Sequence, residues 1–140
     1  MIPGINKPLE ELNKNGYFLF IISNQPDISR GNIEEGTLEK INQIILEKFP
    51  IKEIMVCPHN DYDNCKCRKP KPGMLLNLAE KWDINLKKSY LIGDNWKDMQ
   101  AGKTAGCTTI LLDKSYNIDI KADYRVQDLK NAVKTILTRN

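Results

Sequence analysis

Residues 89–112 read SYLIGDNWKDMQAGKTAGCTTILL. The apolar runs at 89–94 and 107–112 predict two buried strands, and the segment at 96–104 predicts a short helix that ends at Gly106. A strand, a helix and a second strand in this order form a right-handed crossover, which joins parallel strands of one sheet. This stretch therefore indicates an α/β protein.

The same alternation continues on both sides of this unit. Further strands are predicted over 17–23, 51–57 and 122–126, the first of them buried on both faces. Helices are predicted over 7–15, 34–48 and 72–82, and an amphipathic helix closes the chain. We expect a Rossmann-like, doubly wound three-layer sandwich with a mainly parallel sheet, whose chemistry lies at the carboxyl ends of its strands.

Length and composition indicate one ordinary globular domain over 1–140. Hydrophobic residues make up 41% of the 140 residues and charged residues 28%, which argues against a disordered or fibrous protein. The net charge of +3 is too small to suggest a nucleic-acid or membrane partner. No apolar run of membrane-spanning length and no signal peptide is visible, so we expect a cytoplasmic protein. We also expect it to be a monomer.

Three of the four cysteines and the only histidine lie within residues 57–67. Cys57-Pro-His59 and Cys65-Lys-Cys67 supply three thiolates and an imidazole, which is a known ligand set for tetrahedral Zn²⁺. Four protein ligands leave no open position, so this zinc would be structural. Buried cysteines beside an unrelated histidine, or a disulfide, are the alternatives, whereas Cys107 in its apolar strand is expected in the core.

The loop that contains the cysteines and the histidine ends in the sequence Cys67-Arg68-Lys69-Pro70. Arginine offers a planar fork and lysine a compact charge to an anion, and proline restricts the backbone around them. Other polar residues are also expected at strand ends, so this basic motif favours a site that binds an anion. The alternative is a basic turn exposed to solvent.

Polar residues close two of the predicted strands. Ser23 and Asn24 offer small hydrogen-bonding groups suited to phosphate oxygens, although a turn explains them equally well. Asp94 ends another strand with a carboxylate of the type Mg²⁺ prefers, and Asp98 follows at the start of a helix. The alternative is that both aspartates only cap the helix that follows. Arg30 is either a substrate contact or a surface residue.

Taken in order, these motifs resemble the haloacid dehalogenase (HAD) superfamily of phosphatases, and within it the subgroup that carries a zinc loop. The resemblance runs from about residue 3 to the C-terminus and depends on Ser23-Asn24-Gln25, Arg30-Gly31, Cys57-Pro-His59, Cys65-Lys-Cys67-Arg68-Lys69-Pro70, Pro72-Gly73-Met74-Leu75 and Gly93-Asp94-x-x-x-Asp98-Met99.

The resemblance implies hydrolysis of a phosphomonoester through an aspartyl-phosphate, with Mg²⁺ neutralising the phosphoryl charge. The implied substrate is a small phosphorylated sugar, D-glycero-D-manno-heptose 1,7-bisphosphate, with its 7-phosphate retained. Histidinol phosphate is the alternative substrate. Asp94 would bind Mg²⁺, and Asp98 would support the acidic site.

The remaining roles also follow from the resemblance. Ser23 and Lys69 would be the catalytic residues that stabilise the phosphoryl group. Asn24 would help to place the phosphate, and Arg68, with Arg30 as a helper, would bind the substrate.

One element of the superfamily is missing from the printed chain. Its reaction needs an Asp-x-Asp pair directly after an N-terminal strand, but the only such pair here, Asp61-Tyr62-Asp63, lies in the metal loop. We therefore expect a fold that lacks its first N-terminal strand and a chain that is inactive alone. A non-catalytic, zinc-ordered module that binds phosphate is the other reading.

Overall fold

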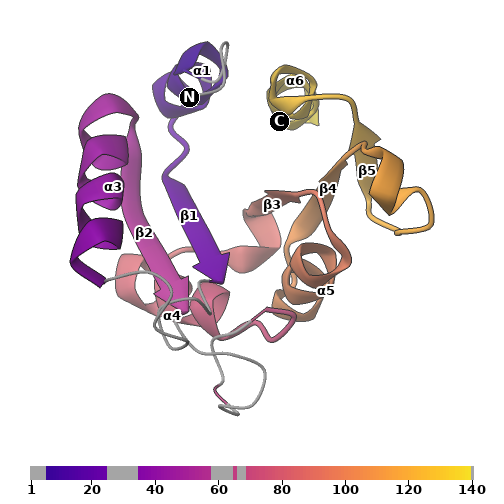
Figure 1. The fold of residues 1–140 in the computed structure, drawn as a ribbon. Helices are drawn as coiled ribbons and strands as arrows, with labels where there is room; N and C mark the ends of the chain where they lie inside the picture. Colours follow the sequence, from indigo (N-terminus) through magenta and orange to yellow (C-terminus); the bar gives the residue numbers. More distant parts are fainter. Residues whose placement is uncertain (1–5, 25–34, 58–64, 66–68, 140) are drawn as a thin grey trace. The chain divides into compact units, whose positions relative to one another are not determined.

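The structure is a computed structural model that describes residues 6–24, 35–57, 65 and 69–139. It divides into two compact units, Met1–Arg68 and Lys69–Asn140, and each is considered by itself. Figure 1 shows both as helices and strands in alternation. The single domain over 1–140 stays a prediction.

The first unit contains helix α1 (Asn6–Lys14), strand β1 (Leu19–Asn24), helix α3 (Glu35–Lys48) and strand β2 (Ile51–Cys57). The two strands are parallel, with Ser23 opposite Val56 and Asn24 opposite Cys57. Helix α3 connects them and lies alongside β2 (Figure 1). The predicted strand over 51–57 is confirmed in full.

The expectation that the strand at 17–23 is buried on both faces is wrong in this structure. The strand begins at Leu19, Phe18 is 54% exposed, and residues 19–23 are only half-buried. Within the unit, the main helical contact of β1 is the short α1. A run of apolar residues shows that a segment can be buried, but other elements must cover it.

The second unit contains a sheet in the order β3-β4-β5, and both strand pairs are parallel. The expected α/β fold with parallel sheets is therefore confirmed. In chain order the elements are α4 (Gly73–Trp82), η1 (Leu86–Lys88), β3 (Tyr90–Gly93), α5 (Trp96–Ala105), β4 (Thr108–Leu112), η2 (Ser115–Asn117), β5 (Tyr124–Val126) and α6 (Leu129–Arg139).

The helix ends in this unit follow the local sequence. Gly106 ends α5 with a φ of 94°, a left-handed conformation that glycine adopts without strain. Pro72 takes the N-cap position of α4 rather than the expected first helical position. The single-turn helices η1 and η2 were not predicted, because three residues are too few to show a helical period.

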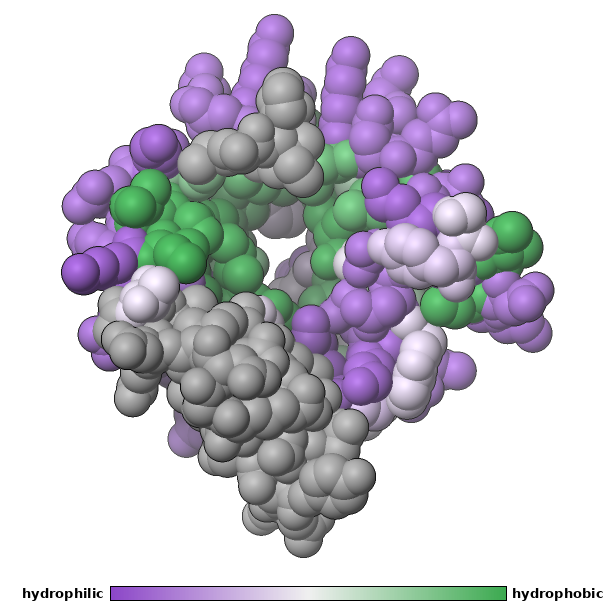
Figure 2. All heavy atoms as spheres, in the orientation of Figure 1, coloured by the Kyte–Doolittle hydropathy of each residue, from purple (hydrophilic) through white to green (hydrophobic). Residues whose placement is uncertain are grey.

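The core of the second unit forms where α4, α5 and α6 pack with β3 and β4. Cys107 is 7% exposed, as expected, and burial raises the pKa of its thiol. Where Figure 2 is not grey, most of the side chains at the edge of the view are hydrophilic. Among the described residues, no helix is long and apolar enough to cross a membrane. The buried apolar residues of the unit are Met74, Leu75, Leu78, Leu91, Met99, Ala101, Cys107, Ile110, Leu111, Ala132, Val133 and Ile136.

Candidate functional site

A mostly buried ion pair joins two of the predicted site residues. The Nζ atom of Lys69, just before α4, lies 2.6 Å from Oδ1 of Asp98 in the first turn of α5. The two side chains are only 13% and 11% exposed. This charge-assisted hydrogen bond fixes the position of the ammonium group.

Gly93 makes room for the Asp98 carboxylate. A Cβ atom added at Gly93 would lie 2.5 Å from Oδ2 and 2.6 Å from Cβ of Asp98. Any larger residue at the end of β3 would therefore push Asp98 away from Lys69. This close approach explains why a glycine stands five residues before Asp98 in the motif Gly93-Asp94-x-x-x-Asp98.

The cap of α5 is Asn95. Its Oδ1 atom accepts a hydrogen bond from the backbone N–H of Asp98 at 3.0 Å. The alternative in which Asp94 or Asp98 caps this helix is therefore wrong, because neither side chain occupies the cap position. Both carboxylates are left for other partners.

Asp94 lies directly after β3 and is held at two places by helix η2. The hydroxyl of Tyr116 donates to Oδ2 of Asp94, and Nδ2 of Asn117 donates to its main-chain oxygen at 2.8 Å. The hydrogen bond to Asp94 raises the pKa of Tyr116 above its usual value of 10.0, so its hydroxyl stays protonated at neutral pH. Nδ2 of Asn95 lies 3.5 Å from Oδ1, the other carboxylate oxygen of Asp94.

Arg125 and Asn117 connect η2 to the strands. Asn117 is fully buried, and the Arg125 guanidinium donates to its side-chain oxygen at 3.1 Å and to its main-chain oxygen at 2.9 Å. Sequence reasoning missed Tyr116, Asn117 and Arg125. No motif marks them, and their relation to Asp94 arises only from the fold.

In the first unit, two of the expected zinc ligands lie together. The Sγ atoms of Cys57 and Cys65 are 3.5 Å apart, which is too far for a disulfide bond of about 2.05 Å. Two thiolates bound to one tetrahedral Zn²⁺ at about 2.3 Å each would be about 3.8 Å apart. The described pair fits that arrangement. Within the described ranges, no group of three metal-ligating side chains is present, and His59 and Cys67 lie outside those ranges.

The other predicted contacts are only partly described. Ser23 is half-buried at the end of β1, and Asn24 is the last residue of that strand. Because β1 and β2 are parallel, both residues lie at the same sheet edge as Cys57. Arg30 and Arg68 lie outside the described residues.

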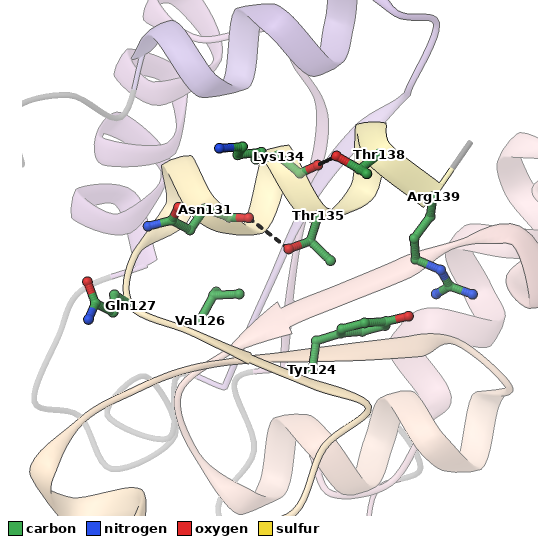
Figure 3. Close-up of a pocket in the computed structure, with 8 residues that line it drawn as sticks. All are labelled: Tyr124, Val126, Gln127, Asn131, Lys134, Thr135, Thr138 and Arg139. Atoms are coloured by element: carbon green, nitrogen blue, oxygen red, sulfur yellow. Dashed lines mark hydrogen bonds between the residues drawn. The ribbon is translucent and has the colours of Figure 1, made fainter.

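Open surface is also present away from these residues. A hollow of about 660 Å³ lies between β5 and α6, where the Arg139 guanidinium sits 5.2 Å from the ring centre of Tyr124 (Figure 3). None of the predicted site residues lines it. The hollow therefore does not belong to the Lys69, Asp94 and Asp98 group.

Comparison with known proteins gives a consistent picture. A family model described as HAD-hydrolase-like matches residues 66–132. A D-glycero-alpha-D-manno-heptose-1,7-bisphosphate 7-phosphatase of Campylobacter jejuni is 42% identical over 101 residues, which are 69% of this chain and 58% of that protein. A D-glycero-beta-D-manno-heptose-1,7-bisphosphate 7-phosphatase of Rhodopseudomonas palustris is 34% identical over 117 residues, 75% of this chain and 65% of that protein.

A solved structure agrees with these relatives. The D,D-heptose 1,7-bisphosphate phosphatase of Bordetella bronchiseptica, complexed with magnesium and phosphate, matches with a TM-score of 0.86 and 25% identity. The match covers 99% of this chain and 84% of that one. The chain spans 58% and 65% of the length of the two curated relatives.

The relatives correct one expectation. Their names give the 7-phosphate as the group removed, whereas the resemblance led us to expect that it is retained.

Proposed function

Because residues 66–132 match a HAD-hydrolase-like family model, we propose that this chain forms part of a phosphatase of that family that releases the 7-phosphate of a heptose 1,7-bisphosphate. The named relatives support this substrate over histidinol phosphate. Such an enzyme hydrolyses a phosphomonoester, and its side chains stabilise the charge on the phosphoryl group while that group is transferred.

The ion pair between Lys69 and Asp98 supports this proposal most strongly. Asp94, directly after β3, lies four residues before Asp98. Asp98 holds the Lys69 ammonium at 2.6 Å, in surroundings mostly closed to solvent. A fixed cation in such surroundings stabilises developing phosphoryl charge more than a mobile one does, because it need not reorganise during the reaction. We assign Lys69 the catalytic role and Asp98 the positioning role.

Mg²⁺ fits the acidic group at the end of β3. Asp94 offers carboxylate oxygens, the ligands that Mg²⁺ prefers, and it is not used as a helix cap. When bound, the cation would neutralise charge on the phosphoryl oxygens. The magnesium and phosphate of the Bordetella bronchiseptica structure support this assignment.

We also propose a structural Zn²⁺ held by Cys57, His59, Cys65 and Cys67. The support is the chemistry of this ligand set and the 3.5 Å between the sulfurs of Cys57 and Cys65. Because thiolates persist in a reducing compartment, the site also favours the cytoplasm. Elemental analysis is expected to find about one zinc ion per chain, and its absence would contradict the assignment.

The remaining contacts are proposed from the resemblance and from position. Ser23, at the carboxyl end of β1, would donate to the phosphoryl oxygens, with Asn24 beside it. Arg68 and Arg30 would bind the rest of the substrate.

A second candidate applies to the printed chain by itself. Its only Asp-x-Asp pair lies in the loop of the proposed zinc site, so no aspartate of the chain is assigned as the nucleophile. Without a nucleophile, Arg68, Lys69 and Ser23 would bind phosphate but not turn it over. The 140-residue chain alone is expected to bind a sugar phosphate and to release no inorganic phosphate.

The test uses two proteins, this chain and a chimera that joins it to the part of the Campylobacter jejuni relative that it does not match. With heptose 1,7-bisphosphate, the chimera is expected to release the 7-phosphate in a magnesium-dependent reaction. Lys69→Met is expected to lower kcat about a hundredfold or more, whereas Lys87→Met, an exposed lysine on η1, leaves it unchanged. A chimera that folds without releasing phosphate would contradict the enzyme proposal, and binding by the chain alone would then favour the second candidate.

A further inference from the structure

Two consecutive residues of the loop after β4 reach Asp94. Tyr116 donates a hydrogen bond to its carboxylate, and Asn117 donates to its main-chain oxygen at 2.8 Å. Both belong to η2, and they lie 22 and 23 residues further along the chain than Asp94. One short helix therefore holds both the backbone and the side chain of this residue.

Helix η2 is itself anchored from inside the unit. The Asn117 side chain donates to the main-chain oxygen of Leu112 at 2.8 Å and accepts from the backbone N–H of Lys114 at 2.9 Å. Arg125 of β5 donates to both oxygens of Asn117. These bonds connect η2 to β4 and β5. They therefore fix the backbone position of Tyr116.

The exposure of Tyr116 points to its hydroxyl as the important group. Its side chain is 65% exposed, so the ring adds little to the core. The hydroxyl contacts only one of the two Asp94 carboxylate oxygens, Oδ2. Nδ2 of Asn95 is 3.5 Å from Oδ1, which is long for a hydrogen bond, so Asn95 holds that oxygen only weakly and competes little with a cation for it.

We propose that Tyr116 is a positioning residue for the magnesium-binding carboxylate of Asp94. Its hydroxyl holds Oδ2, so that the carboxylate keeps one orientation and Oδ1 is left for the cation. Carboxylates that bind metals are commonly oriented by such outer hydrogen bonds, and loss of one typically weakens metal binding about 10- to 100-fold. This inference rests on the proposed function, which makes Asp94 the magnesium ligand.

The experiment measures cation binding without turnover. Mn²⁺, a paramagnetic substitute for Mg²⁺, is titrated into the ¹⁵N-labelled 140-residue chain, and line broadening of the backbone amides of residues 93–98 is followed by NMR. Excess Mg²⁺ is expected to reverse the broadening. Tyr116→Phe keeps the ring and removes the hydroxyl, and it is expected to raise the Mn²⁺ midpoint about tenfold. Tyr124→Phe, on β5, is the matched control and is expected to leave the midpoint unchanged.

The outcomes separate this inference from the proposed function. Broadening that Asp94→Asn abolishes supports a cation site at Asp94. If that holds and Tyr116→Phe keeps the wild-type midpoint, or binds more tightly, the positioning role is overturned while the cation site stands. A wild-type chain without broadening at these amides overturns both. Tyr116→Phe should also match the wild-type urea midpoint, and a parallel loss of stability would show a structural role instead.

Discussion

The contact between Gly93 and Asp98 shows how a single hydrogen atom in place of a side chain shapes this site. Gly93 has no role as a turn residue. It is required because the Asp98 side chain occupies the space where a Cβ atom would lie. The ion pair between Asp98 and Lys69 therefore depends on a third residue that carries no functional group.

We predict that Gly93→Ala destabilises the protein by about 1–3 kcal/mol, because the added methyl group overpacks a site with no spare volume. Urea unfolding measures the loss. The same substitution in an Asp98→Gly background is the control, since the atoms that clash are then absent. An equal loss in both backgrounds would show that the close approach is not the cause.

Helix α5 is the element that carries the acidic site, and its first turn depends on Asn95. The Asn95 side chain satisfies the backbone N–H of Asp98, so the cap and the ion pair meet at one residue. Helix η2, which comes later in the chain, donates hydrogen bonds to Asp94 just before α5. The cap of α5 therefore holds Asp98, and η2 holds Asp94.

We predict that Asn95→Ala costs about 1 kcal/mol of stability, because the first turn of α5 loses its cap. Asn95→Ser, which keeps a capping oxygen, should retain most of the stability. Both values come from urea unfolding monitored by circular dichroism. Equal losses in the two variants would contradict the capping role.

At the scale of the whole molecule, the two units depend on different forces. The second unit has an apolar core between helices and a sheet of three parallel strands. The first has a sheet of two strands with half-buried side chains, and Cys57 is the one described apolar residue of β2 that is fully buried. In our proposal, zinc binding stabilises the end of this smaller sheet.

We predict that removal of zinc by a strong chelator loosens the first unit selectively. Hydrogen exchange is expected to speed up in β2 and to change little in β3 and β4, because the proposed ligands begin at the end of β2. Mass spectrometry of the exchanged peptides measures this. Re-addition of zinc should restore protection, and a uniform change in both units would contradict a local role.

The sequence by itself determined the order of the α-helices and strands, the end of α5 at Gly106 and the positions of the acidic and cysteine motifs. These features depend on neighbours a few residues apart, through side-chain periodicity and backbone preference. Only the tertiary structure decided that Lys69 pairs with Asp98, 29 residues away, and that Tyr116 holds Asp94. Such contacts depend on the order in which strands pair and on the loops between them, and local sequence patterns carry no record of either.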